Sequence, residues 1–373
     1  MGGFLSSADM DAVLPPHTVF DGHNDTLVDL CFPEPGKDRS FLERSDHGHL
    51  DLPRALEGHF GGGFFAICVP PSPTTRGFLD SDAVLTETGY EMPLPPPLDQ
   101  AYAQRMTISV MASLFRLEMQ SDSKIRVVRT AKELASCLRQ GVIAVVLHFE
   151  GAEALDPELD ALYVFHAAGL RSLGIVWSRP NAFATGVPFK FPGSPDTGPG
   201  LSERGKGLVR ACNRLGIMLD LAHLNEQGFW DVAGLSDAPL VVTHTAAHAL
   251  CPSTRNLTDK QLDAVGASGG VVGVAFHVGN LRADGCQDAN TPIAEIVRHI
   301  DYIAGRIGIE HVALGSDFDG AIMPLEMGDV TGLPRLIEAL RGHGYDDAAL
   351  RKVAHENWLR LLDRTLDSRP AGV

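Results

Sequence analysis

Histidine and carboxylate side chains stand directly after apolar, β-branched runs of the sequence that have the composition of buried strands. His23 and Asp25 follow the first run, and Glu150 follows the third. His223 and His244 follow the fifth and the sixth. At a strand end, residues i and i+2 point to the same side, so His23 and Asp25 can bind one metal ion. Imidazole nitrogen and carboxylate oxygen are ligands that zinc and similar divalent ions accept.

A second pair of candidate ligands, His223 and His244, is separate from the first, and Glu150 is placed to bridge the two pairs. Two bridged ions about 3.5 to 4 Å apart can polarise one hydroxide between them. Asp317 adds a carboxylate after the last run, and His148 alternates to the same side as Glu150, either to support a ligand or as a core histidine. A single histidine near a strand end is more often structural than ligating. The joint placement of these residues favours a metal centre.

The elements that must position these side chains are eight predicted strands that alternate with segments of helical spacing. The strands are residues 18–21, 63–69, 142–149, 172–177, 217–222, 240–243, 271–276 and 311–315, and helices between them include 157–168, 203–215, 259–267 and 293–307. Near-continuous apolar strands alternating with amphipathic helices indicate parallel pairing with both sheet faces covered. The pattern predicts an α/β fold, a closed (β/α)8 TIM-like barrel, in which all strand ends that carry these side chains meet at one mouth.

The whole chain, residues 1–373, is predicted to be a single domain with its barrel core at about 18–365. A segment at about 70–130 is longer than one crossover requires and is rich in proline, so a long excursion is expected after the second strand. This excursion is predicted to end with a helix at 100–120. Helices at 333–341 and 348–362 are expected to close the barrel.

The composition excludes several classes of function. Lys and Arg number 31 against 47 Asp and Glu, a net charge of −16, which has the wrong sign for a nucleic-acid partner. No run approaches the roughly 18 to 20 apolar residues of a membrane-spanning helix. Residues 1–16 lack the pattern of a secretory signal, so a cytoplasmic location is expected. The six cysteines form no C-x-x-C pair and are predicted to be reduced and mostly buried.

Over residues 20–362 the chain resembles the membrane (renal-type) dipeptidase family, within the amidohydrolase-like metal barrels. The resemblance is carried by an ordered set of motifs: DGHND at 21–25, HLDLPR at 49–54, GGGFF at 61–65, EG at 150–151, GLSERG at 200–205, NRLG at 213–216, DLAH at 220–223, THTA at 243–246, RN at 255–256, GSDFDG at 315–320 and ENWLR at 356–360. Single pieces such as the glycine run are weak signals, but their order along the chain is specific.

The resemblance implies a site with two Zn²⁺ ions bridged by Glu150 and a hydroxide. His23 and Asp25 would bind one ion, and the pair of histidines named above would bind the other. The aspartate that matches Asp317 takes a proton from the attacking water and delivers it to the leaving amine. The arginine that matches Arg255 binds the terminal carboxylate of the substrate, for which a planar guanidinium is well suited; the alternative is a surface or helix-capping arginine.

The sequence departs from the renal pattern at two places near the substrate. Where the family often has a histidine that polarises the carbonyl oxygen, this chain has Trp177, followed by Arg179 and Asn181. Either Trp177 reshapes the pocket, or Arg179 or Asn181 substitutes, or Trp177 is plain packing. At the end of the seventh strand, His277 stands near the position of an aromatic hydroxyl, where it could alter the side-chain pocket.

The predicted function is therefore that of a zinc-dependent metallo-dipeptidase that cleaves L-L and L-D dipeptides with a metal-bridging hydroxide as the nucleophile. Small peptides are the expected partners, and the resemblance implies a homodimer. One alternative is a hydrolase of the same metal barrel class that acts on an N-acyl amino acid, a lactone or a cyclic amide. The other is a non-catalytic barrel that binds metal or peptide. The ligand set would also accept cobalt or manganese.

Overall fold

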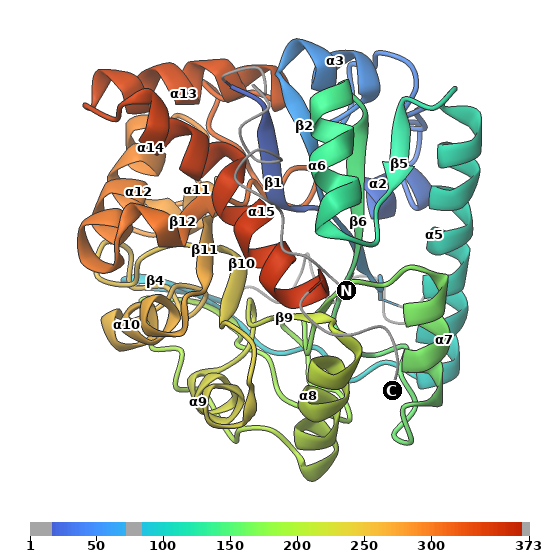
Figure 1. Ribbon diagram of the computed structural model, residues 1–373. Coiled ribbons are helices and arrows are strands. Elements are labelled where there is room, and N and C mark those ends of the chain that lie inside the picture. Colours follow the sequence, from blue (N-terminus) through green and yellow to red (C-terminus); the bar gives the residue numbers. More distant parts are fainter. Residues whose placement is uncertain (1–16, 72–83, 368–373) are drawn as a thin grey trace.

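The computed structural model describes residues 17–71 and 84–367 (Figure 1). Eight parallel strands form the barrel: β1 (Val19–Asn24), β2 (Phe60–Cys68), β6 (Ile143–Glu150), β7 (Ser172–Gly174), β9 (Met218–Asp220), β10 (Val241–Thr245), β11 (Val271–Val274) and β12 (Val312–Leu314), side by side in that order. The predicted (β/α)8 barrel is confirmed. Residues 1–16, 72–83 and 368–373 lie outside the described residues, so both ends of the predicted 1–373 domain and part of the 70–130 excursion are not addressed.

The first and last strands are joined just beyond their C-terminal ends, which nearly closes the ring. The amide of Asp317 donates to the carbonyl oxygen of His23 at 3.0 Å, and the amide of Asp25 donates to that of Phe318 at 2.8 Å. Below them, the Asp21 carboxylate accepts bonds from the amide and the hydroxyl of Ser316, both at 2.7 Å. The seam between β1 and β12 therefore runs directly under the mouth of the barrel.

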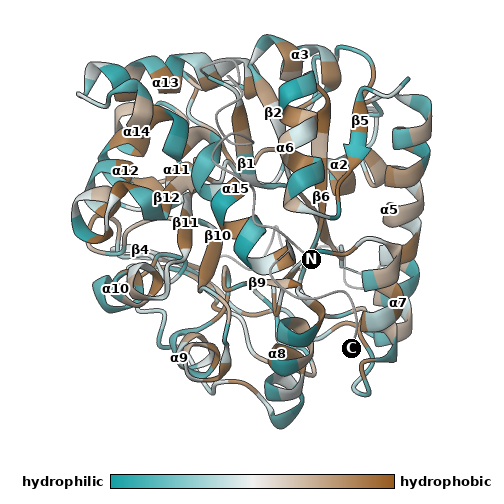
Figure 2. Ribbon diagram, in the orientation of Figure 1, coloured by the Kyte–Doolittle hydropathy of each residue, from teal (hydrophilic) through white to brown (hydrophobic). Residues whose placement is uncertain are grey.

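Helices surround the strands and turn their apolar faces inward (Figures 1 and 2). They are α2 (Thr26–Cys31), α3 (Leu52–Glu57), α5 (Gln100–Gln120), α6 (Ala131–Gln140), α7 (Asp160–Ala168), α8 (Glu203–Leu215), α9 (Glu226–Leu235), α10 (Asp259–Ser268), α11 (Val278–Leu281), α12 (Ala294–Ile307), α13 (Leu333–Gly342), α14 (Asp347–Arg351) and α15 (Asn357–Leu362). The strands between them are buried on both faces; all eight residues of β6 are buried. This covering of both faces is why the strands are largely apolar, with their polar residues gathered toward the C-terminal ends.

Capping residues account for helix ends that match the prediction. The N-cap Ser202 of α8 accepts a bond from the amide of Gly205, and Gly216 ends the helix in the left-handed conformation. Asp99 caps α5 in the same way through the amide of Tyr102. Helices α8 and α5 therefore occupy the predicted ranges 203–215 and 100–120.

The predicted closing helix at 348–362 is present but is not α-helical throughout. Helices α14 and α15 are separated by a π-helical turn at Lys352–Glu356. In this turn the His355 ring bonds to the carbonyl oxygen of Thr18 at 2.8 Å. Directly after the turn, the side-chain amide of Asn357 donates to the carbonyl oxygens of Ile309 and Val312, both at 2.8 Å. The wider turn lets these buried polar side chains reach the bottom of the barrel, which helical spacing alone does not reveal.

A second, three-stranded antiparallel sheet was not predicted. It consists of β3 (Val84–Thr86), β4 (Gly89–Met92) and β8 (Phe189–Phe191), whereas a further short strand, β5 (Ile125–Val127), pairs with the start of β6. Strands β3 and β4 belong to the excursion after β2, and β8 belongs to the segment after β7. Because these strands are short and their partners are distant in sequence, no local periodicity marks them.

Two smaller predictions concern the thiols and the membrane. All six cysteines are free, and Cys137, Cys212 and Cys251 are buried, while Cys286 is exposed. None of the described helices has the length and apolar composition that a membrane crossing requires.

Trp358 of α15 fills the end of the barrel opposite the mouth. Its indole donates to the carbonyl oxygen of Leu314 at 3.0 Å, and its ring lies edge-on to Phe64 with centroids 5.2 Å apart. A Cβ atom on Gly22 or Gly273 would lie 2.7 or 3.1 Å from this ring and closer still to the carbonyl oxygen of Thr243, so these positions need glycine. The fully buried indole therefore closes this end of the barrel, and the interior side chains pack against it.

We expect Trp358→Ala to lower the free energy of unfolding by about 3 to 5 kcal/mol, because it leaves a large cavity among strands that cannot collapse. Urea denaturation followed by circular dichroism measures this change. Tyr163→Ala, at a side chain that is 50% exposed, is the control and should change stability little. Equal losses in the two variants would contradict the role assigned to Trp358.

Candidate metal centre and substrate pocket

The ends of four barrel strands bring the five predicted ligands together. His23 and Glu150 lie within the last two residues of β1 and β6, and His244 lies within β10. His223 follows β9 in a turn, and Asp25 follows β1. Four of these side chains are buried, and Asp25 is partly buried.

Donor atoms of these residues converge on one oxygen, Oε1 of Glu150. The Nε2 atoms of His223, His244 and His23 lie 3.0, 3.4 and 3.6 Å from it. The Nε2 atoms of His223 and His244 are 3.1 Å apart, and Nε2 of His23 lies 3.5 Å from Oδ2 of Asp25. The pairs expected from the sequence, with Glu150 between them, are therefore adjacent in space.

Hydroxyl groups orient two of the imidazole rings. The Thr243 hydroxyl donates to Oδ2 of Asp220 at 2.6 Å, so its oxygen accepts the bond from Nδ1 of His244 at 2.9 Å. That bond assigns the proton of His244 to Nδ1 and leaves a lone pair on Nε2. The Ser178 hydroxyl lies 2.8 Å from Nδ1 of His223 and can act on this ring in the same way. Such partners typically fix the tautomer of a metal-binding histidine.

Burial sets the charges in this group. It lowers the pKa of His223 and His244 well below the usual value, so both rings are neutral. Burial also raises the pKa of Glu150 to about 8. For His23, burial acts to lower the pKa, but the adjacent carboxylates, above all Glu150, raise it to about 10.

The arrangement fits a divalent cation. Both ring nitrogens of the fully buried His23 have no hydrogen-bond partner among the described residues. Next to it, the lone pair assigned to Nε2 of His244 and Nε2 of the neutral His223 ring face the oxygen of Glu150 at 3.0 to 3.4 Å. Buried polar atoms rarely stay unpaired, and a cation satisfies imidazole and carboxylate donors together. The chemistry of the donor set therefore suits a metal centre at the mouth of the barrel.

Asp317 stands beside this centre, in the turn after β12. Its backbone is left-handed, with φ at 66°, and His223 has φ at 64°. Such conformations concentrate at functional sites, where surrounding hydrogen bonds hold them. Burial raises the pKa of Asp317 to about 6. The carboxyl group can therefore both accept and release a proton near neutral pH.

A cavity of about 460 Å³ opens above the ligands, a size typical of small-molecule sites. Its walls include Asp25, Glu150, His223 and Asp317 together with Arg255, Trp177 and His277. Three of the four predicted substrate-binding residues thus reach the cavity. Asn181 does not line it; its amide group bonds to the backbone of Ile175, Phe183 and Ala184 and shapes the loop after β7.

Arg255 carries a buried positive charge at this cavity. Its guanidinium donates to the carbonyl oxygen of His244 at 3.4 Å, and Thr245 holds its backbone oxygen at 2.9 Å. Within residues 17–71 and 84–367 no carboxylate forms an ion pair with it. Burial lowers the pKa of Arg255. A guanidinium in this position can bind a carboxylate that enters the cavity.

The segment Trp177–Arg179 sits where the family's histidine was expected. The Trp177 ring packs against His223 with centroids 5.9 Å apart. Arg179 stacks behind Trp177 at 5.2 Å, donates to the carbonyl oxygen of Val69, and faces Glu153 at 3.9 Å. Trp177 therefore shapes the cavity wall, whereas Arg179 supports it from outside the cavity.

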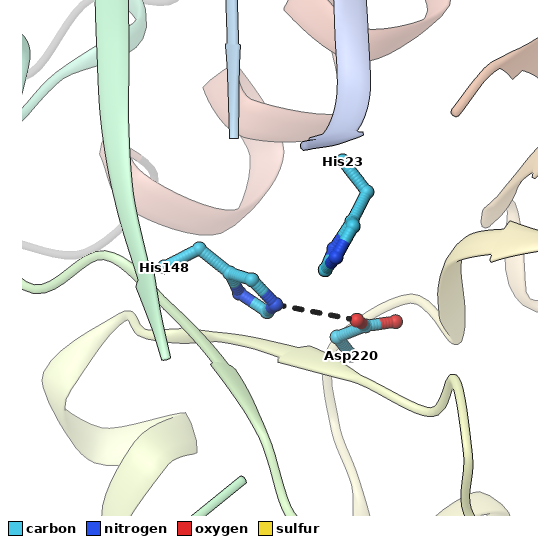
Figure 3. A group of neighbouring side chains, drawn as sticks. All are labelled: His23, His148 and Asp220. Atoms are coloured by element: carbon cyan, nitrogen blue, oxygen red, sulfur yellow. Dashed lines mark ion pairs between the residues drawn. The ribbon is translucent and has the colours of Figure 1, made fainter. Parts of the chain in front are cut away.

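His148 lies below the predicted metal ligands, in the interior of the barrel. Figure 3 shows it with His23 and Asp220, each coming from a different strand and pointing toward the others. Its Nδ1 bonds to the Ser172 hydroxyl at 2.8 Å, and its Nε2 is 3.5 Å from Oδ2 of Asp220. Burial lowers the pKa of His148 well below the usual value, so the ring is neutral. It packs edge-on against His23, with ring centroids 5.6 Å apart.

Comparison with known proteins identifies the family. The model of the membrane dipeptidase family (peptidase family M19) matches residues 7–369. The chain belongs to the membrane dipeptidase family. Among curated relatives of this dipeptidase, an uncharacterized protein in the pqqA 5′ region of Klebsiella pneumoniae is 51% identical over 252 residues, or 68% of this chain and 93% of that protein.

Solved structures of M19 metallopeptidases resemble this dipeptidase closely. The crystal structure of dipeptidase AC is 50% identical, with a TM-score of 0.89, over 95% of this chain and all of that chain. A metallopeptidase from Rhodobacter sphaeroides, solved with a phosphinate mimic of the dipeptide L-Ala-D-Ala, is also 50% identical, with a TM-score of 0.87, over 93% of this chain and 99% of that one. The protein is thus a metallo-dipeptidase of the amidohydrolase-like barrel type.

The residues that orient the ligands were missed by the sequence analysis. Thr243 directly precedes His244, and Asp220 opens the DLAH motif that ends in His223. These positions were visible in the motifs, but no spacing rule connects Asp220 to Thr243. Ser178 lies 45 residues before His223 and carries no sequence signal.

We expect Ser178→Ala to weaken Zn²⁺ binding about 10- to 100-fold, because the His223 ring loses the partner of Nδ1. Titration against a chelator of known affinity measures the change, and Ser178→Thr should restore most of it. Ser172→Ala is the matched control, because Ser172 bonds to Nδ1 of His148, which is not a predicted ligand. A similar loss in both alanine variants would show that general packing, rather than ring orientation, is responsible.

Proposed function

We propose that this dipeptidase binds two zinc ions and cleaves L-L and L-D dipeptides. His23 and Asp25 hold one ion, His223 and His244 hold the other, and Glu150 lies between them. The observation that carries this proposal is the convergence of three imidazole Nε2 atoms within 3.0 to 3.6 Å of Oε1 of Glu150. Nitrogen and carboxylate donors suit zinc, and cobalt or manganese would compete for the same ligands.

Ions held by His23, Asp25, Glu150, His223 and His244 would supply Lewis-acid activation of a water nucleophile and of the peptide carbonyl. The residues of the chain handle the proton and the substrate. The Asp317 carboxylate takes the proton of the attacking water and gives it to the leaving amine, a transfer that its raised pKa of about 6 favours. The Arg255 guanidinium binds the α-carboxylate of the C-terminal residue and thereby fixes the scissile bond above the centre.

Acceptance of a D-residue is supported by a relative. The Rhodobacter sphaeroides metallopeptidase, at 50% identity, was solved with a mimic of L-Ala-D-Ala. In this chain the equivalent recognition depends on Arg255, which selects the carboxylate and not the side chain beside it. Pairing into a homodimer and a cytoplasmic location stay predictions, of which light scattering on the purified protein tests the first.

The rival function is hydrolysis of an N-acyl amino acid, lactone or cyclic amide by the same metal barrel. It shares the ligands, so metal content does not separate the two. A non-catalytic binding barrel is disfavoured because Asp317, with its raised pKa beside the ligands, serves no purpose in binding alone.

Asp317→Asn should lower kcat for dipeptides by about 10² to 10⁴-fold, because the amide cannot carry the proton. The assay is a panel of dipeptides with L- and D-residues at each position, added to zinc-reconstituted protein. Zinc content, measured by inductively coupled plasma mass spectrometry, should stay at two ions per chain in the variant. Unchanged turnover of cleaved substrates in Asp317→Asn would refute the proposed proton transfer.

Arg255→Ala should raise KM mainly for substrates with a free terminal carboxylate, and Arg255→Lys should recover only part of the loss. Comparing each dipeptide with its C-terminal amide isolates this contact. The wild type should prefer the free acid by about 10-fold or more, and Arg255→Ala should lose the preference. An equal loss on acid and amide would refute carboxylate binding by Arg255.

A further inference from the structure

The small sheet β3-β4-β8 turns one face toward the cavity. In its register Leu85 pairs with Tyr90, which pairs with Phe191, and Met92 pairs with Phe189. Successive residues of a strand point to opposite faces, so Tyr90 and Met92 share a face and Glu91 between them points away. The cavity walls include Leu85, Tyr90, Met92 and Phe189, whereas Glu91 forms an outer ion pair with Lys190 at 2.9 Å.

The two rows of this face have different neighbours. Phe189, in the row of Met92, contacts both Trp177 and His223, with ring centroids 5.6 and 6.0 Å apart, so this row stands beside a predicted ligand. Tyr90, in the other row, lies close enough to Arg255 for the two groups to interact electrostatically.

The positions of Asp317 and Arg255 define the direction in which a dipeptide would bind in the cavity. If the proposed function holds, its C-terminal residue spans from Asp317, which protonates the leaving amine, to Arg255, which binds the carboxylate. That residue therefore lies on the Tyr90 side. The N-terminal residue lies on the other side of the scissile carbonyl, next to Met92, Phe189 and Trp177.

Charge is scarce on this part of the wall. Arg255 is the single fixed cation among the described residues that line the cavity, and the terminal carboxylate occupies it. Beside Met92, Phe189 and Trp177, a negatively charged side chain of the N-terminal residue would lose water without gaining a partner. An apolar side chain would instead gain by leaving water.

We propose that Met92, Phe189 and Trp177 form a subsite that selects dipeptides with an apolar N-terminal residue. The inference rests on the proposed function and names its substrate class. Met92 comes from the loop after β2 and can be changed apart from the predicted metal ligands, whereas Trp177 and Phe189 also pack against His223.

The test measures kcat/KM of the zinc-loaded enzyme for Leu-Ala, Asp-Ala, Glu-Ala and Gly-Ala. Leu-Ala should exceed Asp-Ala, whose side chain has a similar shape, by about 10- to 200-fold. Met92→Ala should lower the value for Leu-Ala about 10-fold and leave Gly-Ala, which lacks a side chain, nearly unchanged. Met92→Lys should reverse the order of Leu-Ala and Glu-Ala, a change that a general structural defect does not produce.

Glu91→Ala is the matched control, because it alters the same strand on the opposite face and should leave the ratio of Leu-Ala to Asp-Ala unchanged. Cleavage of Asp-Ala as fast as Leu-Ala would overturn the inference, as would an unchanged ratio in both Met92 variants. The ratio of kcat/KM for Ala-Leu to that for Ala-Asp reports on the C-terminal residue. If the Met92 variants change this ratio, the assignment of the subsite to the N-terminal residue is overturned. If the wild type cleaves no dipeptide at all, the proposed function itself fails, and this result is distinct from the others.

Discussion

The crowding of buried donor atoms around Glu150 is the constraint on which the rest of the structure depends. Three imidazole nitrogens lie within 3.0 to 3.6 Å of one carboxylate oxygen, and a divalent cation would satisfy these ligand atoms together. Such a group persists only where the backbone gives it no room to separate. The parallel barrel provides this rigidity, because its strand ends are tied to one another by the sheet and by the seam between β1 and β12.

Hydrogen bonds next to the rigid strand ends fix the orientation of two imidazole rings, those of His244 and His223. Asp220 holds Thr243, and Thr243 holds His244, while Ser178 holds His223. Left-handed backbone at His223 and Asp317 is strained, and the buried bonds around it offset the strain. The orientation of the two imidazole rings is thus set by Asp220, Thr243 and Ser178, which do not line the cavity.

The structure separates chemistry from selection. The proposed ligands and the proposed proton carrier come from strand ends, whereas the apolar part of the cavity wall comes from the long loops after β2 and β7. The loops meet as the sheet β3-β4-β8, which places Met92 and Phe189 against Trp177. Changes at Met92, on the loop after β2, can therefore alter the substrate, whereas the loop after β7 also supports the metal centre through Ser178 and His223.

The sequence by itself determined the barrel, its strand order and the ligand candidates, because apolar strands have a strong local signal and their C-terminal ends must share one mouth. The motif order also placed Arg255 and Asp317 near that mouth. Only the tertiary structure decided that Asn181 turns toward its own loop, that Ser178 supports His223, and that β4 pairs with β8. These are contacts between segments far apart in the chain, and their energy depends on geometry that no local pattern of residues records.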